Sequence, residues 1–332
     1  MLSQRISVIA ILALLVTSGT DTASAGSKKI KIKLDSFTVT SSRPTTASTW
    51  RDNPIRTPAK LTFPSGDDAS GRYPAIVYLL SSGGLKDADK RWQRKFRNEG
   101  YAVLQIDQYS NRGLSLRSGL GKSQSGMSDM SYLSDVYAGI KYLKQNDRID
   151  PDRIATFGRS WGGGIQVYTT SDWYQSKVGE GLELKVRVAL YPACYLTIDQ
   201  PVATSGKTLF LLGSKDTWNA PAPCIDYASR LKASGGDITV EILPNAVHSW
   251  DNGYPVENNR GITVWGRCHI LWNPSTMEAW ASGSSDKLEF ADGSVKKLWD
   301  NCVVKTSVKV GGTPGQIAKT EEIVLGYLGN HL

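Results

Sequence analysis

Residues 153–162 read Arg153-Ile154-Ala155-Thr156-Phe157-Gly158-Arg159-Ser160-Trp161-Gly162. The first half is a short apolar run typical of a strand, the second half fits the pattern Gly-x-Ser-x-Gly, and a helix is expected from Gly163 to Thr170. A serine between two glycines at such a strand-to-helix turn is held clear of the sheet, and the positive end of the helix favours negative charge beside it. The segment therefore predicts that Ser160 is a nucleophile. The alternative is an ordinary serine in a glycine-rich turn.

The alternation of strand and helix recurs on both sides of this segment. Short apolar runs closed by glycine or a polar loop are typical of buried parallel strands. We expect such strands at 75–80, 101–106, 186–190, 208–212 and 238–243. Apolar residues at three- and four-residue steps predict helices at 130–144, 225–232 and from about 316 onward. The alternation predicts an α/β fold with a mostly parallel central sheet and helices on both faces.

A serine hydroxyl becomes a nucleophile when a neighbouring base takes its proton, so a histidine is expected nearby. The chain has only three histidines. His331 is the penultimate residue and His269 lies in a tryptophan-rich segment, whereas His248 follows the last predicted strand. Position and scarcity therefore predict His248 as the base.

The acid that orients this histidine is expected on a loop after a neighbouring strand. Asp216 lies just beyond the strand 208–212, which gives the order Ser, Asp, His along the chain that α/β-hydrolases use. We predict that Asp216 accepts the imidazole N–H and fixes the tautomer of the ring. Asp199, after the preceding strand, and Asp226 are the competing carboxylates.

An oxyanion hole needs two backbone N–H groups that face the developing negative charge. One is expected from Trp161, the residue after the nucleophile. The other is expected from the loop Ser81-Ser82-Gly83-Gly84, which follows the early strand 75–80. Ser82 and Gly83 are both candidates for this second donor.

The chain resembles the dienelactone hydrolase-like branch of the α/β-hydrolases, in an exported form. The matching segments are Leu80-Ser81-Ser82-Gly83-Gly84-Leu85, Asp107-Gln108-Tyr109-Ser110-Asn111-Arg112-Gly113, Gly158-Arg159-Ser160-Trp161-Gly162-Gly163, Gly213-Ser214-Lys215-Asp216-Thr217-Trp218, Pro192-Ala193-Cys194 and Ala222-Pro223-Cys224. The resemblance covers roughly residues 55–250 plus the last helix. It implies the fold, the Ser–His–Asp triad, the hydrolysis of an ester or lactone, and a disulfide between Cys194 and Cys224.

The chain also departs from this family's pattern at two places. The name-giving enzymes use a cysteine nucleophile where this chain has Ser160, so the resemblance does not extend to the dienelactone substrate. Many relatives carry His-Gly at the start of the oxyanion loop, where this chain has Leu80-Ser81. Backbone donors do not depend on these side chains, so the oxyanion hole is still expected.

The N-terminus has the features of a secretory signal. Arg5 precedes an apolar run from Ile6 to Val16, and Ala23-Ser24-Ala25 is a small-x-small cleavage site. We predict a signal peptide at 1–25 and a single exported domain at 26–332, secreted or periplasmic. No later stretch is apolar enough to cross a membrane.

Export determines how the four cysteines are interpreted, because an oxidising compartment favours two disulfides. Four cysteines permit three pairings, and the sequence alone does not choose, although closeness favours Cys194 with Cys224 and Cys268 with Cys302. A zinc site is the alternative, but there is no Cys-x-x-Cys and His269 has no partner at ligand spacing. No metal and no organic cofactor is expected.

The segment from about 253 to 312 does not follow the strand–helix alternation. It is rich in Gly, Asn and Asp and contains Trp265, Trp272, Trp280 and Trp299. We predict an excursion of the main domain stapled by two of the cysteines, with half of a hairpin and its turn at 287–294. Buried packing is the favoured interpretation of the tryptophans, and a carbohydrate-binding surface is the alternative.

One basic run and one glycine-rich pattern resemble nucleic-acid and nucleotide binding features, respectively. The net charge of +8 is scattered, and its densest run, 28–33, alternates like a strand with one solvated face. Gly119-Leu120-Gly121-Lys122-Ser123 resembles the end of a phosphate loop, but Leu116 stands where its first glycine belongs. Neither a nucleic-acid partner nor a nucleotide is therefore expected.

Together these residues predict a serine hydrolase that cleaves a small carboxylic ester or lactone through an acyl-enzyme. One alternative is an amidase or peptidase with the same triad. The other is a catalytically silent protein that holds a glycan or envelope polymer on the same fold. The acyl group, the alcohol and the oligomeric state stay open at this point.

Overall fold

The computed structural model describes residues 28–39, 53–66, 71–121, 127–265, 267–290 and 292–332. The predicted signal peptide, residues 1–25, lies outside the described residues. None of the helices in this part of the chain has both the length and the apolar character that crossing a bilayer requires.

The main sheet is built from short apolar strands, as the sequence predicts. In the described residues it has eight strands in the order β1-β2-β4-β3-β5-β6-β8-β9. These are β1 (Lys29–Phe37), β2 (Pro54–Thr62), β4 (Ala102–Ile106), β3 (Tyr73–Leu79), β5 (Ile149–Arg159), β6 (Val186–Leu190), β8 (Lys207–Gly213) and β9 (Asp237–Leu243). The pairings from β4 to β9 are parallel, and β1 and β2 add an antiparallel edge. The predicted, mostly parallel sheet is confirmed.

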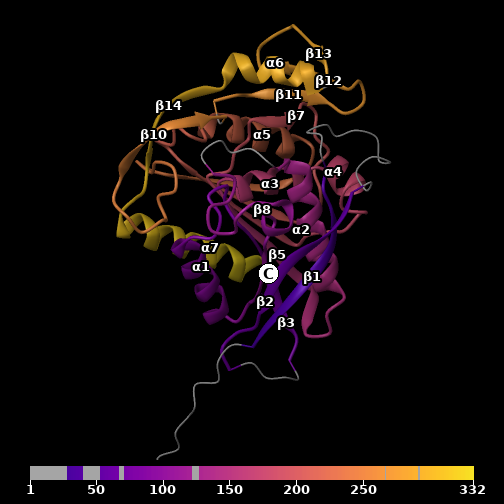
Figure 1. The fold of residues 1–332 in the computed structure, drawn as a ribbon, viewed down its shortest axis with the longest axis vertical. Helices are drawn as coiled ribbons and strands as arrows, with labels where there is room; N and C mark the ends of the chain where they lie inside the picture. Colours follow the sequence, from indigo (N-terminus) through magenta and orange to yellow (C-terminus); the bar gives the residue numbers. More distant parts are fainter. Residues whose placement is uncertain (1–27, 40–52, 67–70, 122–126, 266, 291) are drawn as a thin grey trace, which may run out of the picture.

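The order of the strands determines which face each helix covers. The helices of the described chain are α1 (Asp87–Asn98), α2 (Asp129–Lys144), α3 (Trp161–Thr169), α4 (Asp172–Lys177), α5 (Pro221–Ala233), α6 (Asp292–Cys302) and α7 (Pro314–His331), with a short 3₁₀ helix η1 (Ser110–Arg112). Because parallel crossovers are right-handed, the step from β3 to β4 places α1 on one face, and the opposite steps place α2, α3 and α5 on the other. Glu321 of α7 pairs with Arg91 and Lys95 of α1, so α7 lies beside α1 (Figure 1).

The N-terminal strands are longer than the sequence indicates. The predicted polar strand at 28–33 is part of β1, whose Lys29, Lys31 and Lys33 are exposed and whose Leu34 is buried. β2 pairs with β1 over its full length. The solvated face predicted for the lysine run is thus present in the structure.

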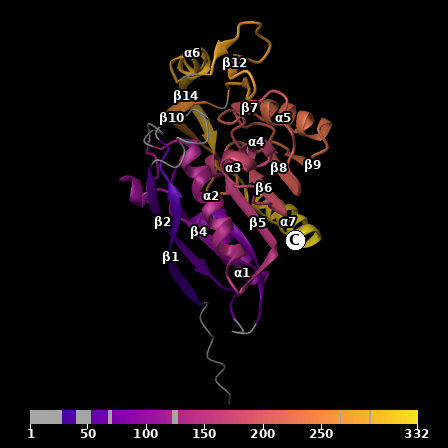
Figure 2. The same cartoon turned by 90° about the vertical axis from the view of Figure 1, so that its right-hand side faces the viewer.

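The tryptophan-rich segment forms two small sheets. β11 (Ile270–Asn273), β12 (Glu278–Ala281) and β13 (Leu288–Glu289) form a sheet with β7 (Leu196–Ile198), which pairs with β11 in parallel. β10 (Glu257–Val264) pairs with β14 (Val304–Val310) in an antiparallel ribbon. Figure 1 and Figure 2 show α6, β12 and β14 at the end of the molecule away from the C-terminus.

One local prediction in this segment is wrong. The strand half of the predicted hairpin at 287–294 exists, because Leu288 of β13 pairs with Ala279 of β12. The expected turn does not, because helix α6 begins at Asp292. Asp, Gly and Ser are common both in turns and at helix starts, so their presence does not distinguish the two.

Candidate active site

Ser160 lies at the junction of β5, which ends at Arg159, and α3, which begins at Trp161. Its backbone has φ 53° and ψ −115°, a conformation that residues with a side chain rarely adopt and that stores strain. The flanking glycines make the turn sterically possible, since a Cβ on Gly158 would lie 2.2 Å from the carbonyl oxygen of Gly162. The structure thus has the sharp strand-to-helix turn that the sequence predicts at Ser160.

Three side chains meet at this turn. Ser160 Oγ lies 3.0 Å from His248 Nε2, and His248 Nδ1 lies 2.8 Å from Asp216 Oδ2. The other carboxylate oxygen of Asp216 accepts the backbone N–H groups of Trp218 at 2.8 Å and Asn219 at 2.9 Å. His248 and Asp216 are almost completely buried. The carboxylate is therefore held by its own loop while it faces the imidazole.

The imidazole is fixed on both sides. The ring of His248 packs edge-on against Tyr191 at a centroid distance of 4.9 Å, and Trp218 lies against it at 4.7 Å. The backbone carbonyl of His248 accepts the N–H of Gly311, 3.0 Å away, so the end of β14 supports this loop. The base is consequently oriented by contacts from three separate parts of the chain.

The two competing acids contact other residues. Asp226 lies 2.7 Å from Arg230 and 3.2 Å from His269. The backbone N–H of Asp199 bonds to Trp272, in the second sheet. Of the three acids weighed from the sequence, Asp216 is the one that contacts His248.

The candidate oxyanion loop is held by two buried tyrosines that sequence reasoning missed. The hydroxyl of Tyr132 donates to the carbonyl of Leu80 at 3.0 Å, and that of Tyr109 donates to the carbonyl of Ser81. Burial raises the pKa of both phenols, which keeps them protonated as donors. Of the two donor candidates, Ser82 lines the cavity beside Ser160.

The glycine pattern that resembles a phosphate loop supports this same loop. The N–H of Leu120 bonds to the carbonyl of Ser82 at 2.8 Å. Gly119 has φ 59°, and a Cβ there would lie 2.1 Å from the oxygen of Ser82. Gly119 is therefore required by close packing against the oxyanion loop. The remaining part of the pattern, from Lys122, lies outside the described residues.

A cavity of about 340 Å³ opens beside Ser160. Its lining is rich in aromatic side chains, which include Trp161, Tyr168, Tyr195, Trp218, Trp265 and Trp299. The last two come from the tryptophan-rich segment, where the rings of Trp265 and Trp299 pack edge to face at 5.4 Å. Trp272 and Trp280 are buried instead, as the favoured interpretation predicts. The segment thus contributes both to the core and to the cavity wall.

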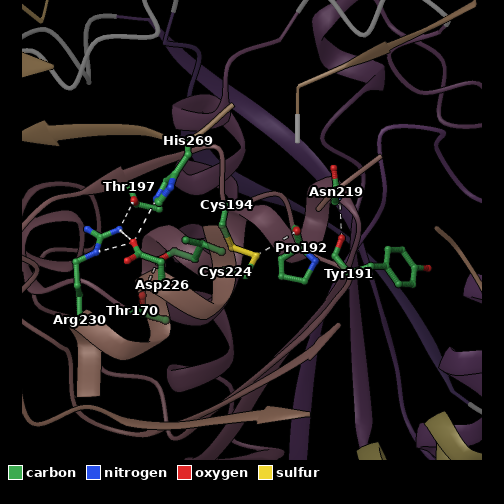
Figure 3. Close-up of a disulfide and its surroundings, with 11 residues drawn as sticks. Thr170, Tyr191, Pro192, Cys194, Thr197, Asn219, Cys224, Asp226, Arg230 and His269 are labelled. Carbon is green, nitrogen blue, oxygen red and sulfur yellow. Dashed lines mark hydrogen bonds and ion pairs between the residues drawn. A yellow bond between two sulfur atoms is a disulfide. The ribbon is translucent and has the colours of Figure 1, made fainter. Parts of the chain in front are cut away.

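Disulfides join Cys194 to Cys224 and Cys268 to Cys302, the two pairings favoured by closeness in the sequence. Figure 3 shows the first bridge, which links the loop after β6 to the start of α5. Nearby, the side chain of Asn219 donates to the carbonyl of Tyr191 at 2.9 Å. The loop that carries Asp216 and the start of α5 after it are therefore tied to the loop after β6 by one hydrogen bond and one covalent bond.

Comparison with protein families matches residues 61–267 to the model of the dienelactone hydrolase family. The chain belongs to the dienelactone hydrolase family. It is therefore a hydrolase that acts on ester bonds. The matched range contains Ser160, Asp216 and His248, and the family assignment confirms the resemblance found in the sequence.

Individual relatives are distant. A Bradyrhizobium protein named "Probable 2-oxo-3-(5-oxofuran-2-ylidene)propanoate lactonase" is 24% identical over 213 residues, which cover 62% of this chain and 85% of that protein. A Yersinia pestis protein named "Putative carboxymethylenebutenolidase" is 23% identical, and the aligned region covers 59% of this chain and 75% of that protein. The crystal structure of a Klebsiella pneumoniae "Putative Dienelactone Hydrolase" has a TM-score of 0.51 at 17% identity, over 69% of this chain and 90% of that one. This likeness confirms the α/β-hydrolase fold.

Proposed function

We propose that this protein is a serine esterase or lactonase in which Ser160, His248 and Asp216 cleave a carboxylic ester through an acyl-enzyme. The observation that carries the proposal is the continuous hydrogen-bonded chain from Asp216 through His248 to a strained serine that lines a cavity. A nucleophile, its base and the group that orients the base in this order are what acyl transfer requires.

The proposed reaction has two halves. Ser160 Oγ attacks the ester carbonyl while His248 Nε2 takes its proton, and Asp216 stabilises the imidazolium that forms. The backbone N–H groups of Trp161 and of Ser82 or Gly83 stabilise the oxyanion. His248 then protonates the leaving alkoxide, which departs as an alcohol or, for a lactone, remains tethered to the acyl group. Water attacks the acyl-enzyme with the same base and releases the acid.

A labelling experiment tests the nucleophile. A fluorophosphonate probe should form a covalent adduct on the peptide that contains Ser160, and Ser160→Ala should abolish labelling and lower ester turnover by about a thousandfold or more. Ser176→Ala, which removes an exposed hydroxyl on α4, is the matched control and should label and turn over normally. A folded Ser160→Ala variant that retains most of its activity would refute the assignment.

A matched ester and amide with the same acyl group test the amidase alternative. An ester needs less assistance to its leaving group than an amide does, so the proposed esterase should favour the ester strongly. Faster cleavage of the amide would assign the triad to amide hydrolysis instead. No turnover of either compound, together with no labelling, would favour the silent binding protein.

The proposed setting is the periplasm or the cell exterior, with the mature chain folded as a single domain. Two disulfides are compatible with an oxidising compartment. The pairing of β7 with β11 supports one folding unit, because it joins the tryptophan-rich segment to the body. N-terminal sequencing of the exported protein tests cleavage after Ala25.

A further inference from the structure

The cavity beside Ser160 contains a carboxylate that takes no part in the proposed reaction. Asp129 begins helix α2 and is partly exposed toward the cavity, next to the helix cap Ser128. Among the lining residues that the structure describes, Asp129 is the one charged side chain, and the rest are apolar, aromatic or neutral polar. Within the described lining, Asp129 is therefore the source of formal charge in the cavity.

The partners of Asp129 are all neutral. One of its oxygens accepts the indole N–H of Trp161 at 2.6 Å. The other accepts the hydroxyls of Tyr168 at 2.7 Å and Tyr195 at 2.8 Å. Burial, followed by the charge of Asp129, raises the pKa of both phenols, so they remain protonated donors. These bonds hold the carboxylate in place, and no cation among the residues that the structure describes pairs with it.

A negative charge in an aromatic, weakly polar cavity repels an anionic substrate group and attracts a cationic one. Electrostatic interactions are stronger in such a site than in water, and like charges brought together oppose binding. Aromatic faces, in contrast, accept apolar groups and attract cations. The walls of Trp218, Trp265 and Trp299 therefore add to the discrimination by Asp129.

We propose that this cavity binds esters or lactones in which the part that enters the cavity is aromatic or apolar and carries no negative charge. Asp129 is the residue that excludes anions. The proposal rests on the proposed function, since Ser160 makes the cavity the substrate site. It separates this chain from its Bradyrhizobium relative, which is named for a propanoate substrate and therefore for an anion.

Three esters with one aromatic acyl group and one leaving group provide the test. They carry at the same ring position a methyl, a carboxylate or a trimethylammonium group. The carboxylate ester should have a kcat/KM about tenfold or more below that of the methyl ester, and the trimethylammonium ester should be at least as good as the methyl ester. Equal values for the carboxylate and methyl esters would overturn the proposal.

The variant Asp129→Asn tests whether Asp129 causes the preference for the methyl ester over the carboxylate ester. The amide has the same shape and can still accept the indole N–H of Trp161. The ratio of the methyl to the carboxylate ester should fall by about tenfold, whatever happens to the absolute rates. Asp172→Asn removes a carboxylate from the first turn of α4, outside the cavity lining, and should leave the ratio unchanged. A folded Asp129→Asn protein with the wild-type ratio would refute the role of Asp129.

Binding measurements keep this proposal separate from the nucleophile assignment. The ligands are three aryl methyl ketones that carry the same ring substituents as the three esters but have no ester bond. Their binding to Ser160→Ala protein can be followed by the quenching of tryptophan fluorescence. The carboxylate-bearing ketone should bind about tenfold or more weakly than the methyl-bearing one. If Ser160→Ala protein still cleaves esters, the nucleophile is wrong but this ranking stands. If the ranking is absent or reversed, the charge proposal fails even with the triad intact.

Discussion

Arg159, the residue before the candidate nucleophile, forms a buried ion pair with Asp251, three residues beyond the candidate base. Its Nε lies 2.9 Å from Asp251 Oδ2, and its Nη1 lies 2.7 Å from Asp89 on α1. Tyr191, whose ring packs against His248, also donates its hydroxyl to Asp251 at 2.6 Å. The turn that carries the serine, the loop that carries the histidine and helix α1 are thus joined by one guanidinium.

Arg159→Gln should strongly destabilise the fold, because it leaves two buried carboxylates without their cation. Breaking one side of a buried ion pair costs about 3–5 kcal/mol. Urea denaturation monitored by circular dichroism would measure the loss. Arg153→Gln, at an exposed position of the same strand, is the control and should change stability by less than about 0.5 kcal/mol. Similar effects of the two substitutions would contradict a structural role for the ion pair.

Asp251 should contribute to the acid sensitivity of the protein. Burial by itself would raise the pKa of this carboxyl, but Arg159, with the hydrogen bonds of Tyr191 and Trp92, lowers it below its ordinary value. A depressed folded pKa gives stability that is present above the unfolded pKa of about 3.9 and is lost as the pH falls through the folded value. Unfolding free energies measured from pH 7 to below pH 4 should decline more steeply for the wild type than for Asp251→Asn. Parallel curves would exclude this linkage.

Asp216→Asn should lower kcat by about three to four orders of magnitude with little change in folding, since an amide can hold the imidazole in the wrong tautomer. Asp199→Asn is the matched control, because Asp199 is the acid that the sequence left as the alternative. Its ester turnover should stay within about twofold of the wild type. A larger loss in Asp199→Asn than in Asp216→Asn would move the acid to the earlier loop.

The Cys268–Cys302 bridge should affect substrate binding more than chemistry. Trp265 and Trp299 each lie three residues before one of its cysteines, so the bridge holds the two rings that line the cavity. Cys268→Ser/Cys302→Ser should raise KM for an aromatic ester several-fold with a smaller change in kcat, and should cost roughly 3–4 kcal/mol of stability. Steady-state kinetics below the melting temperature would measure this.

The other bridge supplies the comparison. Cys194→Ser/Cys224→Ser frees the neighbour of the loop that carries Asp216, so kcat should fall more than KM rises. The hydrogen bond from Asn219 to Tyr191 remains in that variant and limits the loss. Identical kinetic effects of the two double variants would show that the bridges act only through overall stability.

The sheet and the convergence of three candidate residues could be predicted from the sequence because both depend on local patterns. Apolar runs mark buried strands, and the carboxyl ends of parallel strands meet at one edge, so the loops after β5, β8 and β9 must converge. With three histidines in the chain, the choice of His248 followed from its position after β9. The contacts observed between Ser160, His248 and Asp216 agree with that reasoning.

The features that sequence reasoning missed depend on contacts between distant residues. Arg159 occupies the variable position of Gly-x-Ser-x-Gly, and nothing in its neighbours indicates that Asp251 and Asp89 surround it in the core. Asp129 lies one residue before the predicted helix 130–144 and received no role from the sequence, because its indole and phenol partners are 32 to 66 residues away. A charged residue looks the same in a sequence whether it is solvated or buried, so only the folded chain distinguishes them.

The antiparallel pairing of β10 with β14 has a consequence for how such enzymes diversify. Val264 lies opposite Val304, so the tryptophan-bearing segment leaves and re-enters the body at one place. A segment whose two ends are adjacent can be lengthened, shortened or exchanged without moving those ends apart, provided that the replacement keeps the pairing of β11 with β7. The residues that face the substrate and the residues that break its bond are therefore free to evolve at different rates. Grafting a different segment between β10 and β14 is the natural way to give the same hydrolytic centre a new preference.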